Sequence, residues 1–209
     1  MAARLIPVKL KQFNFMSGQS IIPSATPAKW SVNDYHRMIK SGILRDRRVE
    51  LINGEIWEMP PEGPLHTSTN INAVKYLRSL LDGLAEVREA HPITLANSEP
   101  EPDVAIVRLP DIIYLTRHPQ PDDIYWIIEI ADRTLAIDLG RKKKDYALAQ
   151  IEEYWVIDLT NQKLRIFRDP VGDNYTDERE VTQGTVNPLA FSSVRVSVDR
   201  LLGTNFSTQ

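Results

Sequence analysis

The clearest hydrophobic pattern in the chain is an apolar run at residues 124–131, IYWIIEIA. In a strand, alternation divides these residues between two faces, with Tyr125, Ile127, Glu129 and Ala131 on one and Ile124, Trp126, Ile128 and Ile130 on the other. Both faces are apolar apart from Glu129, which is typical of a central strand covered on both sides. Because burying an unpaired carboxylate is costly, the pattern predicts that Glu129 has a cationic or metal partner.

Helical patterns appear at three places. Ser31, with an acidic residue three positions later, is suited to begin a helix that ends at Gly42. Apolar residues at helical spacing predict a core-facing helix over 65–81, and Gly83 suits the left-handed position that follows. A third helix is expected over about 138–151. These helices are long enough to cover the faces of a sheet.

Strand patterns fill much of the remaining chain. Asn53-Gly54 lies between two runs of strand-type residues and predicts a two-residue hairpin turn. Further strands are expected at 86–96, 102–108, 124–131, 153–158 and 163–168, with weaker ones at 175–181 and 194–198 and a terminal turn at 198–202. Together the elements predict an α/β or α+β fold, a mixed central β-sheet flanked by helices.

The N-terminal segment has a different composition. Residues 1–33 contain no Asp or Glu, and Pro7, Pro23 and Pro27 interrupt any regular element. We therefore expect an irregular N-terminal extension at residues 1–30 and one domain at residues 31–209, a usual size for a single core. A loosely packed extension is the favoured interpretation, and a basic arm that touches nucleic acid is the alternative.

Charge and composition limit the classes of function. The 25 basic and 28 acidic residues give a net charge of −3, which argues against a generally basic nucleic-acid coat but allows a local basic cleft. Without cysteine the chain has no disulfide, thiol nucleophile or thiolate zinc site. No run approaches the roughly 20 apolar residues of a membrane span, and the N-terminus has no signal-peptide core. A cytoplasmic protein without a membrane segment is expected.

Asp103 and Glu129 are the first candidate site residues. Asp103 begins the predicted strand 102–108, and if this strand lies beside 124–131 the two carboxylates can converge on one divalent cation. Mg²⁺ fits such a site because it is a hard ion that accepts carboxylates, water and a phosphate oxygen as ligands. The competing interpretations are a structural Arg paired with Glu129 and a turn or cap role for Asp103.

The third candidate is a lysine in the predicted helix that follows. Leu139, Tyr146 and Gln150 define the inward face of this helix. Helical periodicity places Lys142 and Lys143 on either side of that face, and it directs Arg141, Lys144 and Asp145 away from it. Periodicity alone does not choose between Lys142 and Lys143, and a basic run is usually a solvated face. An inward ammonium next to the metal-bound carboxylates would orient an attacking water, help to deprotonate it, and stabilise charge on a phosphate.

Several stretches between about Val49 and Asp158 carry a family resemblance. They are VELINGEIWEMP, His66 at the opening of a helix, NSEPEPDVAIV, YWIIEIADRTLAIDLGRKKKDYA and EYWVIDL, in this order. The chain thereby resembles the Uma two-type (cyanobacterial-type) putative restriction endonuclease family of the PD-(D/E)XK nuclease superfamily. SVRVSVDRLL is similar to the closing segment of that family, whereas residues 1–30 have no counterpart.

The resemblance implies a restriction-endonuclease-like core with a metal site at Asp103 and Glu129. The superfamily's usual lysine position, two residues after the glutamate, is Ala131 here, and the family alignment instead places the lysine at Lys142. Glu50 matches an acidic position that often completes the metal shell, so its implied roles are metal binding and catalysis. His66 matches a recurrent position that could contact phosphate or assist proton transfer, although helix capping or packing is an equal alternative.

One departure from the family lies at the end of the crossover helix. Where the family usually turns through a glycine, this chain has Ala149-Gln150-Ile151-Glu152, so the helix runs longer or ends in another way. The proposed ligands are not affected.

The leading hypothesis is an Mg²⁺-dependent or Mn²⁺-dependent endonuclease that hydrolyses DNA phosphodiester bonds, using Asp103, Glu129, Lys142, Glu50 and His66. The alternatives are a catalytically inactive nucleic-acid-binding or regulatory module with the same fold, and a structural protein in which the buried charges form an ion-pair network. A homodimer is expected from the resemblance alone, since many enzymes with this core cut two strands.

Overall fold

The computed structural model describes residues 26–203. In chain order its elements are α1 (Val32–Ser41), β1 (Val49–Ile52), β2 (Glu55–Glu58), α2 (Pro64–Leu80), β3 (Glu86–Glu89), β4 (Val104–Val107), η1 (Asp111–Leu115), η2 (Pro121–Asp123), β5 (Ile124–Ala131), α3 (Leu135–Ile137), η3 (Asp138–Lys142), α4 (Lys143–Leu148), β6 (Glu153–Asp158), β7 (Lys163–Val171), β8 (Asn174–Val181), β9 (Thr185–Val186), η4 (Leu189–Phe191), β10 (Val196–Ser197) and α5 (Val198–Leu202). Most of the N-terminal extension expected at residues 1–30 lies outside the described residues, so that boundary stays a prediction.

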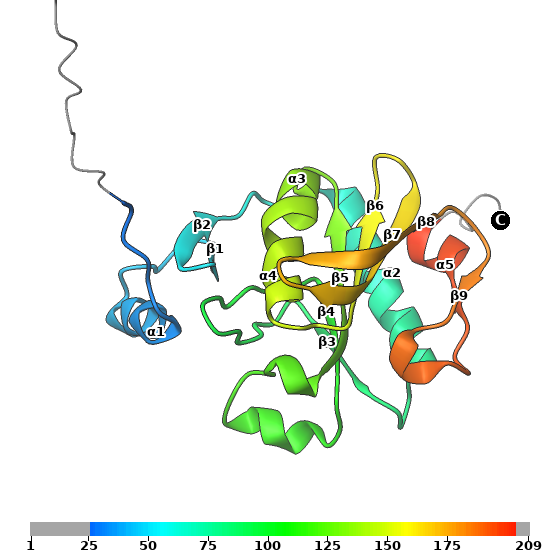
Figure 1. Ribbon diagram of the computed structural model, residues 1–209, viewed down its shortest axis with the longest axis horizontal. Helices are drawn as coiled ribbons and strands as arrows, with labels where there is room; N and C mark the ends of the chain where they lie inside the picture. Colours follow the sequence, from blue (N-terminus) through cyan, green and yellow to red (C-terminus); the bar gives the residue numbers. More distant parts are fainter. Residues whose placement is uncertain (1–25, 204–209) are drawn as a thin grey trace, which may run out of the picture.

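A six-stranded sheet organises the fold, in the order β3-β4-β5-β6-β7-β8 (Figure 1). Its neighbouring strands are antiparallel except for β5 and β6, which run parallel. Parallel neighbours need a crossover, and the helical segment of α3, η3 and α4 provides it. The predicted mixed central sheet flanked by helices is confirmed, and β5 has the predicted bounds, 124–131.

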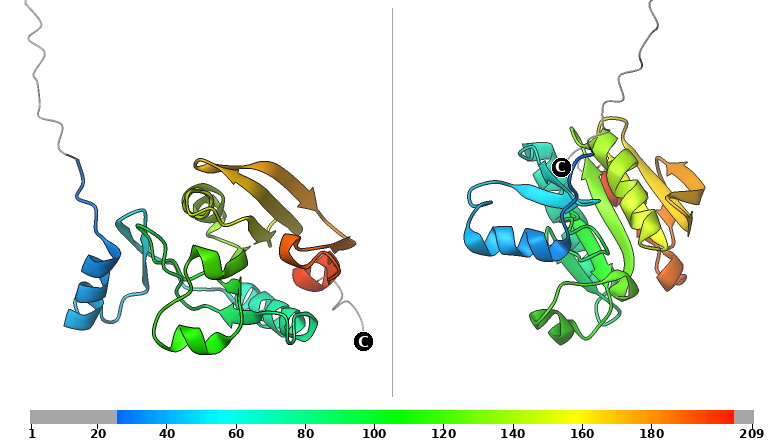
Figure 2. Two further views of the ribbon diagram at one scale, coloured as in Figure 1. Left: turned by 60° about the horizontal axis from the view of Figure 1, so that its bottom comes forward. Right: turned by 60° about the vertical axis from the view of Figure 1, so that its left-hand side comes forward.

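Helices cover both faces of this sheet, and Figure 2 shows β5 between them. On one face α2 and α5 pack over a cluster that includes Leu77, Trp126, Ile128, Trp155 and Leu201. On the other, the crossover helix packs over a cluster that includes Ile127, Ala131, Tyr146, Tyr154 and Phe167. Burial of β5 on both sides removes its apolar side chains from water and leaves Glu129 only 2% exposed.

The predicted alternation along β5 is wrong at its first two residues. The register between β4 and β5 shifts at Ile106/Val107, so that Tyr125 is the extra residue of a β-bulge in β5. Ile124 therefore joins the cluster that contains Ile127, and Tyr125 packs against the cluster on the opposite face. A bulge adds one residue to one strand and so reverses the alternation on one side of it. The faces from Trp126 to Ala131 are as predicted.

The N-terminal part of the described chain is α1 and the β1–β2 hairpin. Ser31 and Asp34 form a capping box and Gly42 has a φ of 80°, so both predicted ends of α1 are confirmed. Asn53 and Gly54 have φ angles of 47° and 73°, which confirms the predicted hairpin turn. A side chain at Gly54 would come within 3.0 Å of the Lys29 side chain.

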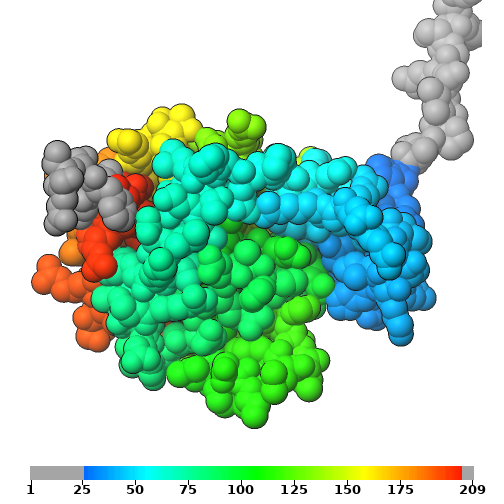
Figure 3. Space-filling view, turned by 180° about the vertical axis from the view of Figure 1, so that it is seen from behind, coloured from blue at the N-terminus to red at the C-terminus, as the bar shows by residue number. Residues whose placement is uncertain are grey.

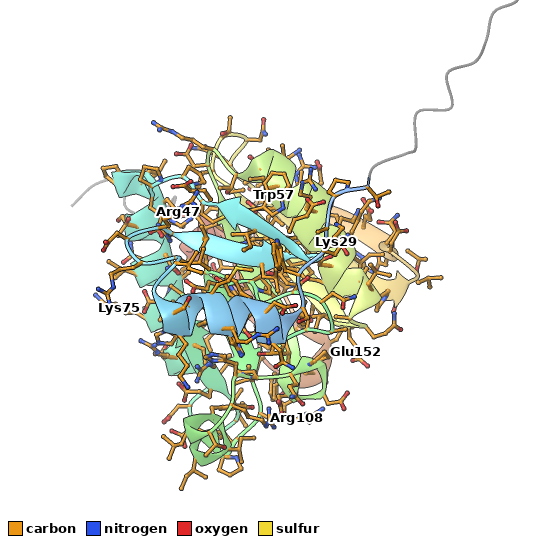
Figure 4. The ribbon with its side chains drawn as sticks, turned by 90° about the vertical axis from the view of Figure 1, so that its left-hand side faces the viewer. Lys29, Arg47, Trp57, Lys75, Arg108 and Glu152 are labelled. Carbon is orange, nitrogen blue, oxygen red and sulfur yellow. The ribbon has the colours of Figure 1, made fainter. Side chains whose placement is uncertain are left out.

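The hairpin is tied to the rest of the fold through its turn and its outer strand. The Asn53 amide donates to Ser98 Oγ at 2.7 Å and to Asp145 Oδ2 at 3.0 Å. Arg141 from the crossover helix stacks its guanidinium 3.9 Å from the centre of the Trp57 ring. Figure 4 shows this side of the molecule, with Trp57 and Lys29 around the hairpin. These contacts fix β1, and with it Glu50, relative to the sheet.

Several predicted elements differ in extent from those observed. The strand expected at 102–108 is β4, Val104–Val107, so Asp103 lies just before it and does not begin it. The strand expected at 86–96 is only β3, four residues long, because the chain turns away at Ala90, whose φ is 47°. The crossover helix begins earlier than predicted and ends at Leu148, after which Gln150 adopts a left-handed φ of 59°. Gln150 thus takes the conformation that the expected glycine would have supplied.

Gly83 also has a positive φ, 71°, as predicted, although α2 itself ends at Leu80. The weak C-terminal patterns correspond to the edge strand β8 and to β10, and α5 has the bounds of the predicted terminal turn. Figure 3 shows the molecule from behind, where α2 and the segment before it lie at the surface and continue toward the hairpin.

Candidate active site

A small polar pocket opens where the hairpin, α2, the sheet and the crossover helix meet. The residues that line it are Arg48, Glu50, Met59, Pro60, Glu62, His66, Glu101, Asp103, Glu129, Thr134, Asp138 and Lys142. All five site residues expected from the sequence are therefore brought together. They come from five separate elements or loops, so only the tertiary fold places them side by side.

Lys142 occupies the centre of the pocket on the crossover helix. Its side chain is only 4% exposed, and its Nζ lies 3.0 Å from Glu129 Oε1 and 3.2 Å from Glu50 Oε2. Burial alone would lower the pKa of Lys142, but the carboxylates of Glu129 and Glu50 outweigh it and raise the pKa above its ordinary value. Lys142 is therefore protonated at neutral pH.

A π-helical turn at Asp138–Lys142 sets the direction of this lysine. The Lys143 amide donates to the carbonyl of Asp138, five residues earlier, so one extra residue is accommodated in the turn. Lys142 then points into the pocket, whereas Lys143 points away from it toward the sheet, pairing with Glu178 and lying over Phe167. The structure thus separates the two lysines that helical periodicity left equivalent.

The same turn makes one prediction wrong. Asp145 does not point away from the core but is buried, accepting hydrogen bonds from Ser98 Oγ at 2.5 Å and the Asn53 amide at 3.0 Å. A regular helix of 3.6 residues per turn was assumed, and the π turn shifts the phase of every residue after it. Asp145 holds the hairpin and does not line the pocket.

Glu129 is fully enclosed beside Lys142. Its Oε1 accepts from Tyr146 Oη at 2.7 Å and its Oε2 from the Asp103 amide at 3.3 Å. Burial is the largest influence on this carboxyl and raises its pKa well above the ordinary value, against the lowering effect of Lys142. Tyr146 was recognised in the sequence only as a helix-face residue, yet it is the hydrogen-bond donor that orients Glu129.

Asp103 lies between the end of β5 and α2. Its Oδ2 accepts from the Ile130 amide at 2.7 Å and lies 3.3 Å from His66 Nε2. The other ring nitrogen of His66, Nδ1, is 3.4 Å from Glu62 Oε2. Burial works to lower the pKa of His66, but the hydrogen bond and charge of Asp103 raise it overall. His66 thus bridges two carboxylates.

Three acidic residues of the pocket were not identified from the sequence. Glu62 and Glu101 lie in loops, where spacing carries no orientation, but Asp138 stands four residues before Lys142, a spacing that could have indicated it. Burial raises the pKa of Asp138 to about 6. Burial likewise raises the pKa of Glu101, with a further contribution from the nearby Glu50.

The pocket chemistry fits a divalent cation. Six carboxylates line it against the two basic side chains of Arg48 and Lys142. Glu50 Oε2, Asp138 Oδ2 and His66 Nδ1 are buried and make no hydrogen bond. Buried acceptors without partners are costly, and oxygen-rich groups of this type are the ligands that Mg²⁺ and Mn²⁺ prefer. The residues present therefore suit a bound metal ion.

Comparison with known proteins agrees with this geometry. Residues 32–199 match the family model described as "Uma2: Putative restriction endonuclease". The chain belongs to this family. The matched range begins at α1 and ends within α5, so it spans the hairpin, the sheet and every residue of the pocket.

Among solved structures, the Uma2 chain is similar to one titled as a putative nuclease belonging to DUF820 from Anabaena variabilis. The TM-score is 0.64 at 16% sequence identity, and the alignment covers 85% of this chain and 98% of the other. At this identity the likeness shows a shared fold. None of the curated proteins compared with the chain matches it. Within residues 26–203, no helix has the length and apolarity needed to cross a membrane.

Proposed function

We propose that this Uma2 protein is a divalent-metal-dependent endonuclease, with Mg²⁺ or Mn²⁺ as the ion, that hydrolyses phosphodiester bonds in DNA. The observation that carries the proposal is the convergence of Glu50, Asp103, Glu129 and the protonated Lys142 in one pocket. Buried acidic residues next to a buried ammonium are costly for stability, and a reaction at a charged phosphate is a reason to retain them.

The metal would be held by the carboxylates of Asp103, Glu129 and Glu50. When bound, it would offset charge on the phosphate and make a coordinated water a stronger nucleophile. Glu50 Oε2 is buried and makes no hydrogen bond, but it lies 3.2 Å from Lys142 Nζ, so a metal ion would share this carboxylate with the ammonium. The backbone amide of Ile130 holds the Asp103 carboxylate in place.

Lys142 would act through its charge. While the carboxylates around it carry no metal, the amine is protonated and has no lone pair with which to take a proton from water. It can hydrogen-bond a phosphate oxygen or the attacking water and stabilise negative charge as the water oxygen bonds to phosphorus and the scissile phosphorus–oxygen bond breaks. His66, whose pKa is raised, is suited to donate a hydrogen bond to phosphate.

Plasmid nicking in Mg²⁺ or Mn²⁺ tests the proposal. We expect Asp103→Asn, Glu129→Gln and Lys142→Met each to lower the rate by at least about 100-fold, the scale of a lost charge-stabilising group. Lys144→Met is the matched control on the same helix, because Lys144 is exposed and pairs only with Asp173 at the surface. Cleavage that persists in all three site variants would refute the assignment.

The second candidate is a catalytically inactive nucleic-acid-binding module. The small net charge of the chain, −3, is compatible with this alternative. It predicts salt-dependent DNA affinity without metal-dependent cleavage. Four points stay predictions: the use of DNA over RNA, the homodimer, the cytoplasmic location, and a single domain over residues 31–209. Parallel cleavage of DNA and RNA substrates and a sedimentation measurement of mass would test the first two.

A further inference from the structure

A group of three side chains of metal-ligand type lies beside Glu50 and Glu129, on the α2 side of the pocket. Glu62, His66 and Asp103 each offer one ligand atom, and these atoms lie within 4.8 Å of one another. Within residues 26–203 no other group meets this distance limit, so the ligand atoms of Glu50, Asp103 and Glu129 lie farther apart in the structure. Glu62 comes from the loop before α2 and His66 from the first turn of α2, so they are separate from the strand and helix that carry Glu129 and Lys142.

His66 is the unusual member of this group. Its side chain is 9% exposed, and its buried Nδ1 makes no hydrogen bond although it faces Glu62 Oε2 at 3.4 Å. A buried ring nitrogen without a hydrogen-bond partner is rare, because the loss of hydration is not repaid. A metal ion would be such a partner once the ring releases its proton, because only the neutral imidazole has a nitrogen lone pair to offer.

Both flanking carboxylates are already oriented by other groups. Arg48 donates to Glu62 Oε1, which leaves Oε2 toward His66. The Ile130 amide donates to Asp103 Oδ2 on the side of β5. Outer partners of this kind hold ligands in place and strengthen metal binding. Lys142, by contrast, contacts Glu129 and Glu50, so its positive charge is directed at the other half of the pocket.

We propose that Glu62, His66 and Asp103 form a second cation site, which shares Asp103 with the proposed catalytic metal and selects ions that accept nitrogen, such as Mn²⁺, Co²⁺ or Zn²⁺, over Mg²⁺. Mg²⁺ prefers oxygen and keeps much of its water, whereas imidazole is a favoured ligand of the first-row transition metals. The proposal rests on the nuclease function proposed above and extends it, because it assigns the choice of metal ion to Glu62, His66 and Asp103. The six carboxylates that line the pocket outnumber its two basic side chains, Arg48 and Lys142.

Metal binding by the full chain without nucleic acid tests the proposal. We would titrate Co²⁺ and Mg²⁺ by calorimetry and follow the visible absorption of Co²⁺, which reports nitrogen ligation. We expect the wild-type protein to bind one more equivalent of Co²⁺ than of Mg²⁺. His66→Gln and Glu62→Gln should each weaken that equivalent at least about tenfold, a scale seen even for groups outside the first coordination shell.

Matched controls separate this site from general loss of charge. His91→Gln and Glu58→Gln change exposed residues of the same types, and both should bind Co²⁺ like the wild type. Because Glu62 is partly exposed, Glu62→Gln keeps the test valid even if His66→Gln unfolds. Equal Co²⁺ affinity and spectrum in the wild type and Glu62→Gln would overturn the proposal, as would loss of the extra equivalent in the controls.

The two proposals can fail separately. If His66→Gln and Glu62→Gln lose Co²⁺ while no variant and no wild-type protein cuts DNA, the second site stands and the nuclease function fails. If cleavage depends on Glu129 and Lys142 while Co²⁺ binding is insensitive to His66 and Glu62, the nuclease stands and the second site fails.

Discussion

Replacing Lys142 with methionine should destabilise the protein strongly at alkaline pH. The substitution keeps the length of the side chain and removes its charge, so Glu129 and Glu50 lose the ammonium that lies 3.0 and 3.2 Å away. Removing one partner of a buried ion pair costs about 3–5 kcal/mol, because an uncompensated charge stays buried. At pH 8, without divalent metal, we expect Lys142→Met to lower the free energy of unfolding by about this amount.

The penalty should depend on pH in a known direction. The pKa of Glu129 is already raised by burial, and loss of Lys142 raises it further. A carboxyl whose pKa is higher in the folded state than in the unfolded state costs nothing below the unfolded value, about 4.3, where it is protonated in both. The cost grows as pH rises toward the folded pKa. Lys142→Met should therefore be less destabilised at pH 5 than at pH 8.

Urea denaturation at pH 5 and pH 8 measures both effects. Lys144→Met is the control, since Lys144 is 64% exposed and its surface ion pair should contribute less than about 1 kcal/mol. Mn²⁺ at about 100 times its Kd should restore about 2.7 kcal/mol if the freed carboxylates bind it in the folded state only. Equal losses in the two variants, or a Lys142→Met penalty that is the same at both pH values, would refute the reasoning.

Three further substitutions test other contacts. Tyr146→Phe removes the 2.7 Å hydrogen bond to the buried Glu129 and should cost about 1–3 kcal/mol in urea denaturation, so an unchanged midpoint would contradict the orienting role. Arg168→Met leaves Glu153, which is 0% exposed, without its cation and should cost about 3–5 kcal/mol; a loss below 1 kcal/mol would show that Glu153 is solvated or protonated. Gln150→Gly relieves a left-handed φ of 59° and should raise stability by about 0.5–1 kcal/mol, whereas a lower melting temperature would show that the glutamine side chain outweighs the strain.

Local signals were sufficient for the parts of the fold that depend on neighbouring residues. The capping box at Ser31, the Asn53-Gly54 turn and the apolar run of β5 each fix backbone angles or burial within a few positions. The burial of Glu129 also followed from its place in that run. Such features can be read from sequence because they involve contacts close along the chain.

The wrongly predicted side-chain directions arise where one extra residue interrupts the regular period of a strand or a helix. The bulge at Tyr125 reverses the alternation of a strand, and the π turn before Lys143 rotates the rest of the helix, which turned Asp145 inward. Neither irregularity has a local sequence signature, because each is imposed by packing against neighbouring elements. The position of Glu62 in the site was missed for a related reason, since a loop residue has no periodic face.

The π turn at Asp138–Lys142 has a consequence for how this site can change over generations. Each residue of an α-helix turns the chain by about 100°, so a regular α-helix with the same number of residues here would rotate Lys142 relative to Leu135 by up to about that angle. The sheet could keep its order, but the ammonium would leave the carboxylates. Substitutions can therefore adjust the pocket step by step, while the π turn is a discrete choice: with it Lys142 lies among the carboxylates, and with a regular turn of the same length Lys142 is rotated away from them.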